Sequence, residues 1–137
     1  MSYNSPTVPA KPPKPIAVII EDDEYLGEIF SDVLRGIDLE VRLIRDGESA
    51  MLQLARIKPV LVVLDLNLPK YSGANIFTYM RSDPRLKDVW VIVASADTVQ
   101  AAELNRTDQH NLLTLIKPVS VDQLEQLALR VMKNGEK

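Results

Sequence analysis

Four short apolar runs in this chain each end at residues that could take part in chemistry. The runs occupy 16–20, 60–64, 91–94 and 112–116, and they end at Glu21, Asp22 and Asp23, at Asp65, at Ser95 and at Lys117. In an open parallel sheet, ligands bind beyond the carboxyl ends of the strands. If these runs are neighbouring parallel strands, carboxylates, a hydroxyl and an ammonium meet in one crevice. That set of groups suits a divalent metal and a phosphoryl group.

Asp22 and Asp65 are the first pair to consider. Two carboxylates a few ångströms apart repel by on the order of 1 kcal/mol even when they are solvated. A protein relieves this repulsion by protonating one of them or by binding a cation. Oxygen ligands with room for water suit Mg²⁺. The alternative is that the acids at 21–23 cap a helix, because acids are favourable at a helix N-terminus.

Asp65 is also a candidate nucleophile, because a carboxylate can accept a phosphoryl group to form an acyl phosphate. Catalysis of that transfer consists largely of positioning and of positive charge. Lys117 is a mobile charge suited to one phosphate oxygen, and Ser95 can donate a hydrogen bond to another. Alone, the lysine would be read as a solvated loop residue and the serine as a cap. Their joint placement favours a site.

Strand-like and helix-like patterns alternate from residue 16 onward. Uniformly apolar runs predict strands covered on both faces, whereas 39–44 alternates apolar and charged residues, which is typical of an edge strand. Apolar residues at helical spacing predict the helices. The predicted strands are 16–20, 39–44, 60–64, 89–94 and 112–116, and the predicted helices are 24–35, 47–56, 74–81, 98–106 and one that begins at Ser120.

This alternation predicts an α/β fold, a doubly wound five-stranded parallel sheet in a flavodoxin-like (βα)5 three-layer sandwich. An edge position for the second strand favours the order 2-1-3-4-5, which places the switch point between the first and third strands. We expect this domain to occupy 16–133. A proline-rich disordered tail is expected at 1–15, and a flexible C-terminus at 134–137.

The composition excludes several classes of function. The chain of 137 residues has no cysteine, which rules out disulfides and thiolate sites. Its net charge of −3 gives no reason to expect nucleic-acid binding. No apolar run approaches the roughly 18–20 residues of a membrane span, and the N-terminus lacks an apolar signal core. We therefore expect a cytoplasmic protein with no nucleic-acid or membrane partner.

The motifs together resemble the receiver domain of bacterial two-component response regulators. The matching segments are Ile19-Ile20-Glu21-Asp22-Asp23, then Leu64-Asp65-Leu66-Asn67-Leu68-Pro69 with Gly73, then Val93-Ala94-Ser95-Ala96, and then Lys117-Pro118. One acidic pair would be a weak signal. Four elements in this order, each at a predicted strand end, are specific, and the resemblance covers about 16–133.

The resemblance implies that Asp65 accepts a phosphoryl group from a phosphohistidine, in a reaction that depends on Mg²⁺. Asp22 and Asp65 would bind the metal directly, Glu21 would assist, and Asn67 would supply its backbone carbonyl. The donor would be a sensor histidine kinase or a phosphotransfer protein. Such a receiver catalyses its own phosphorylation and hydrolysis, so it is not an enzyme for an outside substrate.

The resemblance also implies how the signal would leave the site. Ser95 would be the switch hydroxyl and Lys117 would pair with the phosphoryl group, while the bond before Pro118 is usually cis in this family. No DNA-binding segment follows residue 133, so we expect a stand-alone receiver that acts on an effector protein. The expected surface is formed by 98–106, 112–116 and the helix that begins at Ser120, where receivers also commonly form homodimers.

Some residues depart from the family pattern or leave alternatives open. Thr114 lies where many receivers carry an aromatic residue, which puts an aromatic relay in doubt. Asn67 and Asp97 flank the site at positions that tune phosphoryl lifetime in such proteins, and we hypothesise that their polarity holds an attacking water. One alternative is a pseudo-receiver that takes no phosphate. A weaker one is a haloacid-dehalogenase-type phosphatase, which would need an aspartate where this chain has Asn67.

Overall fold

The computed structural model describes residues 12–107 and 110–135, in which strands and helices alternate. The elements are β1 (Ile16–Ile20), α1 (Glu24–Arg35), β2 (Glu40–Ile44), α2 (Gly47–Leu54), β3 (Leu61–Asp65), α3 (Gly73–Ser82), β4 (Trp90–Ser95), α4 (Thr98–Thr107), β5 (Leu112–Ile116) and α5 (Val121–Gly135). Each predicted element is present, and its ends lie within one or two residues of the predicted ones.

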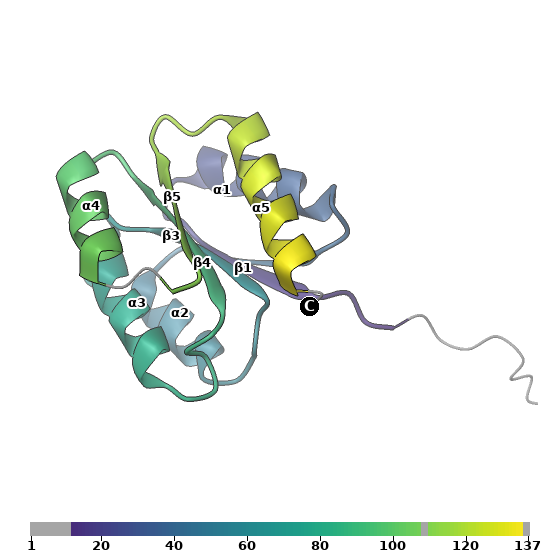
Figure 1. Cartoon of the computed structure of the whole chain (residues 1–137), viewed down its shortest axis with the longest axis horizontal. Coiled ribbons are helices and arrows are strands. Elements are labelled where there is room, and N and C mark those ends of the chain that lie inside the picture. The colour runs from purple at the N-terminus through teal and green to yellow at the C-terminus, as the bar shows by residue number, and fades with distance from the viewer. Residues whose placement is uncertain (1–11, 108–109, 136–137) are drawn as a thin grey trace, which may run out of the picture.

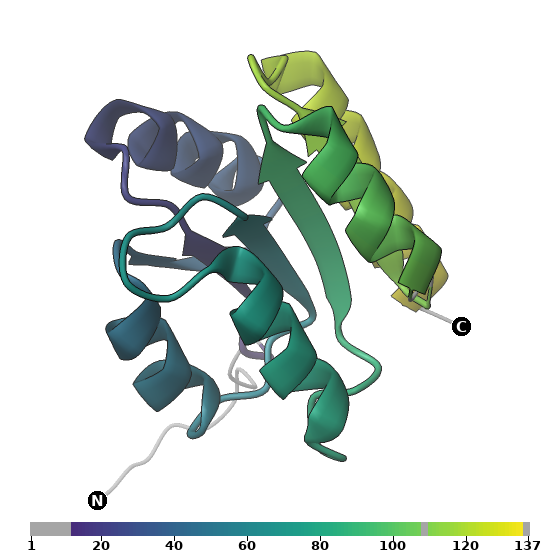
Figure 2. The same cartoon turned by 90° about the vertical axis from the view of Figure 1, so that its left-hand side faces the viewer.

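The strands form one parallel sheet in the order β2-β1-β3-β4-β5, which confirms the predicted topology. Helices α1 and α5 cover one face of the sheet, and α2, α3 and α4 cover the other (Figures 1 and 2). The central strands β1 and β3 are therefore buried on both sides, which explains their uniformly apolar sequences. At the edge, β2 exposes Glu40 and Arg42, whose side chains pair at 2.8 Å.

The carboxyl ends of the strands and the starts of the helices lie at the same edge of this sheet. Each helix begins where a polar side chain can accept a backbone N–H that has no partner inside the helix. The capping contacts are Asp23 Oδ1 with Leu26 N at 2.9 Å, Asp46 Oδ1 with Ser49 N at 2.8 Å, and Ser72 Oγ with Asn75 N at 3.1 Å.

Both ends of the predicted domain can be compared with the structure. The tail predicted at 1–15 falls mostly outside the described residues, which begin at Pro12; its last residue, Pro15, accepts a hydrogen bond from Glu40 N at 2.8 Å. At the other end α5 continues to Gly135, past the expected boundary at residue 133. None of the helices within 12–107 and 110–135 is long and apolar enough to cross a bilayer.

Arg81, at the end of α3, joins the loops at the opposite edge of the sheet from the acidic residues. Its guanidinium donates to four backbone carbonyls and lies 4.6 Å from the centre of the Phe77 ring. Because the planar guanidinium presents several donors in a fixed arrangement, one side chain can satisfy carbonyls from two loops. The acceptors are the carbonyls of Lys87, Val89, His110 and Asn111, at 3.1, 2.9, 2.7 and 3.3 Å.

We expect Arg81→Lys to lower the free energy of unfolding by about 2 kcal/mol, because an ammonium cannot reach all of these carbonyls and some would stay unsatisfied. Urea denaturation of both proteins measures the change. The matched control is Arg106→Lys, since Arg106 forms an exposed pair with Glu103 on α4 and should contribute almost nothing. Equal effects at the two positions would contradict a structural role for Arg81.

Candidate functional site

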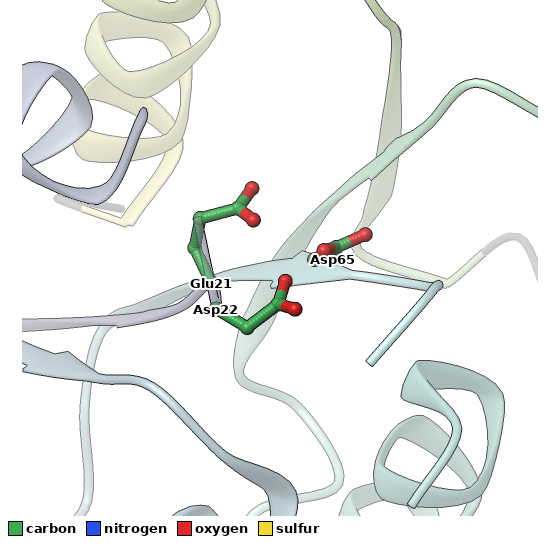
Figure 3. Close-up of side chains that lie close together, drawn as sticks. All are labelled: Glu21, Asp22 and Asp65. Atoms are coloured by element: carbon green, nitrogen blue, oxygen red, sulfur yellow. The ribbon is translucent and has the colours of Figure 1, made fainter. Parts of the chain in front are cut away.

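Three carboxylates meet beyond the ends of the neighbouring strands β1 and β3. Oxygen atoms of Glu21, Asp22 and Asp65 all lie within 4.8 Å of one another, and Figure 3 shows the three side chains side by side. Glu21 is 1% exposed and Asp65 is 3% exposed, whereas Asp22 faces solvent. Ile20 pairs with Leu64 in the register of the two strands, so the residues that follow each strand necessarily come together.

The acidic run at 21–23 divides between a helix cap and the carboxylate cluster. Asp23 caps α1, because its carboxylate accepts the N–H of Leu26. Its own N–H donates to Glu21 Oε2 at 3.2 Å. Glu21 and Asp22 instead contribute to the carboxylate cluster. The capping interpretation is therefore confirmed for Asp23, whereas Glu21 and Asp22 lie in a cluster that could hold a metal.

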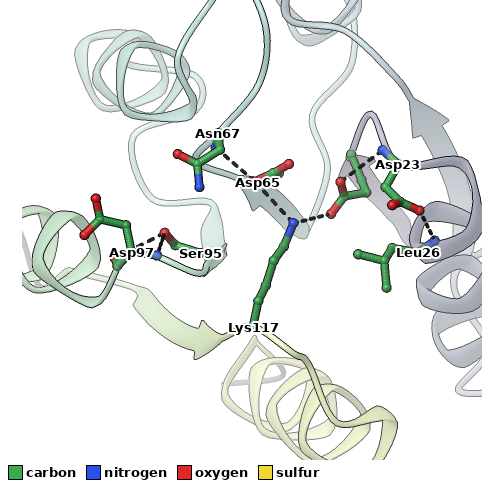
Figure 4. Close-up of polar contacts among 8 residues, drawn as sticks. Asp23, Leu26, Asp65, Asn67, Ser95, Asp97 and Lys117 are labelled. Carbon is green, nitrogen blue, oxygen red and sulfur yellow. Dashed lines mark hydrogen bonds and ion pairs between the residues drawn. The ribbon is translucent and has the colours of Figure 1, made fainter.

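Lys117 brings a positive charge to this cluster from the end of β5. Its Nζ lies 3.2 Å from Glu21 Oε1 and 3.5 Å from Asp65 Oδ1 (Figure 4). The backbone N–H of Lys117 donates to the carbonyl of Ser95 at 2.9 Å, which places this residue at the strand end. The Lys117-Pro118 bond is cis, as the family resemblance implies.

Burial and like charge perturb the ionisation of Glu21. Burial is the largest influence and raises the pKa of Glu21 from 4.5 to about 7; the nearby charge of Asp65 acts in the same direction, while the Asp23 N–H bond and Lys117 oppose it. For Lys117, burial alone would lower the pKa, but the carboxylates of Asp65 and Glu21 outweigh it and raise the pKa above 10.5. The ammonium is therefore held in its charged form.

The raised pKa of Glu21 predicts a pH-dependent stability without divalent metal. The folded state binds this proton more tightly than the unfolded state, so the stabilisation is complete below pH 4.5 and is lost as pH rises to about 7. Glu21→Gln removes the dependence. The variant should become more stable than the wild type with rising pH, by up to about 3 kcal/mol at pH 8. Urea denaturation in EDTA between pH 5 and 8 measures this, and parallel curves would contradict it.

The donor set fits a hard divalent cation. When all three carboxylates are ionised, they and the ammonium sum to a local charge of −3 + 1 = −2, and a cation would relieve this excess. Hard oxygen ligands beside open solvent suit Mg²⁺, which usually keeps some of its water. Asn67, the fourth predicted ligand, follows Asp65 closely in the chain. Its backbone N–H donates to Asp65 Oδ1 at 2.9 Å, and its side chain is exposed.

Ser95 is completely buried at the end of β4, beside β3 in the sheet. Its hydroxyl forms hydrogen bonds with the backbone of Asp97. The Asp97 carboxylate caps α4, a role that our sequence reasoning missed. The available signal was the capping-box spacing of Asp97 and Gln100. His110 pairs with Asp88 at 2.9 Å near the opposite edge of the sheet.

Gly73 lies against the phosphoacceptor candidate itself. A Cβ atom at this position would lie 2.3 Å from the carbonyl oxygen of Asp65 and 2.6 Å from Cα of Leu66. The N–H of Gly73 donates to the carbonyl of Leu66 at 3.1 Å. The start of α3 therefore packs directly on the end of β3, and a glycine is required because no side chain fits between the two backbones.

The fold and the site define a class of small parallel α/β proteins with a cation-competent acidic cluster at the carboxyl edge of the sheet. Residues 17–129 match the family model described as the response regulator receiver domain. The chain therefore belongs to the receiver domain family of two-component response regulators. The predicted family resemblance is confirmed.

Named relatives agree with this assignment. The chain is 32% identical over 128 residues to the response regulator Rcp1 of Synechocystis, in a match that covers 80% of this chain and 86% of that protein. It is 34% identical over 82 residues to the DNA-binding response regulator MtrA of Mycolicibacterium smegmatis, covering 60% of this chain and 36% of that protein. The chain thus spans about a third of the length of MtrA.

Solved structures share the fold. A putative response regulator from Chloroflexus aurantiacus is 26% identical, with a TM-score of 0.77, and the match covers 89% of this chain and 99% of that one. The chemotaxis response regulator CheY4 of Vibrio cholerae is 18% identical and has the same TM-score of 0.77. This match covers 86% of this chain and 98% of that one. At that identity the likeness concerns the fold alone.

Proposed function

We propose that this chain is a phosphoacceptor in a two-component phosphorelay and that Asp65 is the residue that becomes phosphorylated. One observation carries the proposal: the buried carboxylate of Asp65 lies in one cluster with the acids Glu21 and Asp22, and the Lys117 ammonium is 3.5 Å from Asp65 Oδ1. A nucleophilic carboxylate, a fixed cation and a cluster suited to Mg²⁺ are the groups that phosphoryl transfer requires.

In the proposed step, an oxygen of Asp65 forms a bond to phosphorus while the bond between phosphorus and the donor histidine breaks. The electron pair of that bond remains on the ring nitrogen of the histidine. Negative charge spreads over the equatorial oxygens, and Lys117, held by Glu21 at 3.2 Å, places positive charge beside them. Mg²⁺, held by Asp22, Asp65, the carbonyl of Asn67 and Glu21, would supply further charge neutralisation when bound. We expect no turnover of an outside substrate.

The partners follow from this chemistry. The donor is a phosphohistidine on a sensor kinase or a phosphotransfer protein, and we place the reaction in the cytoplasm. Phosphorylation replaces the single negative charge of the Asp65 carboxylate with a phosphoryl group of about −1.5 to −2 charge, which should draw Ser95 and Lys117 inward. The surface formed by α4, β5 and α5 would then change. It exposes Val99, Ile116 and Val121, which suits contact with an effector protein or with a second copy of the chain.

The proposal is tested by incubating the protein with Mg²⁺ and a small acyl-phosphate donor. Intact-mass spectrometry should show one added phosphoryl group, and the addition should disappear when EDTA replaces Mg²⁺. A wild-type protein that stays unmodified with Mg²⁺ would overturn the proposal and favour the pseudo-receiver alternative. A protein that hydrolyses the donor in many turnovers would favour a phosphatase, for which the aspartate expected two residues after Asp65 is replaced by Asn67.

A further inference from the structure

Asp97 connects the proposed switch hydroxyl to helix α4. The N–H of Asp97 donates to Ser95 Oγ at 2.9 Å, and Ser95 Oγ donates to the carbonyl of Asp97 at 3.2 Å (Figure 4). Asp97 Oδ1 accepts the N–H groups of Val99 and Gln100, both at 3.0 Å. The carbonyl of Asp97 also accepts the N–H of Ala101 at 3.1 Å. Ser95 is therefore bonded to the residue that caps α4.

Helix α4 has few other contacts that would hold its first turn. Within its residues 98–106, Ala101 is the one that is fully buried, and Val99 is 74% exposed. A hollow of about 340 Å³ borders the first turn, lined by Ala74, Asp97, Val99, Gln100, Glu103 and Leu104. Inside the part of the chain that the structure describes, Gln100 Oε1 is buried without a hydrogen-bond partner. A segment with few buried contacts opens at low cost, so the cap is a large part of what holds this turn.

We propose that Asp97 is a positioning residue that holds Ser95 in its resting orientation through the cap of α4. This inference rests on the proposed function, in which Ser95 turns to donate to a phosphoryl oxygen on Asp65. When it does so, the hydroxyl leaves the carbonyl of Asp97, because one O–H cannot make both bonds. The strength of the α4 cap therefore sets how readily Ser95 turns towards the phosphoryl group. The first turn of α4 is the first segment whose hydrogen bonds change when Ser95 turns.

This role differs from the hypothesis that Asp97 holds an attacking water through its polarity. The Oδ1 atom already accepts two backbone N–H groups. The two roles differ in what substitutions should do. Asparagine and serine are good capping residues and alanine is a poor one. A capping role therefore predicts that Asp97→Asn and Asp97→Ser resemble the wild type, whereas Asp97→Ala does not. If the charge of Asp97 were responsible instead, all three variants would differ from the wild type, because each of them removes that charge.

The experiment compares the wild type with these three variants in two measurements. Hydrogen exchange at the Val99 and Gln100 amides, without any phosphoryl mimic, reports the cap. Titration with beryllofluoride and Mg²⁺, followed by amide chemical shifts, reports the switched state. Asp97→Ala should speed exchange about fivefold and lower the half-saturating beryllofluoride concentration about fivefold. A fivefold change corresponds to the free energy that the loss of a typical N-cap costs. Asp97→Asn and Asp97→Ser should stay within about twofold of the wild type.

Each outcome decides the proposal. If Asp97→Asn shifts as much as Asp97→Ala, charge and not capping is responsible, and the inference is wrong. If Asp97→Ala speeds exchange but leaves the beryllofluoride titration unchanged, the cap is real but does not position Ser95, and the inference is also wrong. A wild-type protein that binds no beryllofluoride overturns the proposed function itself, together with this role of Asp97. The failures of the two proposals are thus distinguishable.

Discussion

Replacing Asp65 with asparagine is expected to abolish phosphorylation without harming the fold. The amide has nearly the same shape but is not a nucleophile towards phosphorus. The variant also removes a charge that repels Glu21, which raises the pKa of Glu21 in the wild type. Its stability should therefore be unchanged or higher by on the order of 1 kcal/mol. Intact mass after treatment with Mg²⁺ and an acyl phosphate, and urea denaturation, measure the two effects.

The control for this substitution is Asp32→Asn on α1, where the carboxylate is exposed and pairs with Arg35 at 3.5 Å. It makes the same chemical change away from the cluster and should be labelled like the wild type. If Asp65→Asn is labelled to the same extent as Asp32→Asn, another residue accepts the phosphoryl group. If Asp65→Asn is unfolded, its lack of labelling reflects the loss of the fold, and the expectation of unchanged or higher stability is wrong.

Gly73→Ala is the substitution with the largest expected effect on stability. A methyl group would lie 2.3 Å from the carbonyl oxygen of Asp65 and 2.6 Å from Cα of Leu66. Both are backbone atoms, so neither can move aside by changing a rotamer, and α3 must shift away from β3. We expect a loss of at least about 3 kcal/mol in the free energy of unfolding, measured by urea denaturation.

The same shift would displace the turn that positions Asp65, so phosphoryl acceptance should slow by on the order of 10²-fold in the protein that remains folded. Gly36→Ala is the control, because its Cβ would meet the carbonyl of Val33 at 3.2 Å and the position is helical. That variant should stay within about 1 kcal/mol of the wild type. Equal losses for Gly73→Ala and Gly36→Ala would show that the contact with Asp65 is unimportant.

Sequence patterns predicted the architecture because each element carries its own signal. The uniformly apolar runs at β1, β3 and β4 indicated strands covered on both faces, and the alternation in β2 indicated an edge. Element ends were less certain by a residue or two. The end of α2, for example, lies where the Arg85 guanidinium donates to the carbonyls of Leu54 and Ile57, a contact that no local pattern encodes.

The amino-acid order alone determined which residues could meet, because parallel strands deliver their carboxyl ends to one edge of the sheet and Glu21, Asp22, Asp65, Ser95 and Lys117 all follow such ends. The tertiary structure decided which role each of these residues and its neighbours has. In the folded chain Asp23 caps α1 and Asp97 caps α4. The ammonium of Lys117 lies between Glu21 and Asp65. Gly73 packs against the carbonyl of Asp65. Hydrogen-bond partners and burial depend on distances between elements remote in the chain, and local sequence carries no such distances.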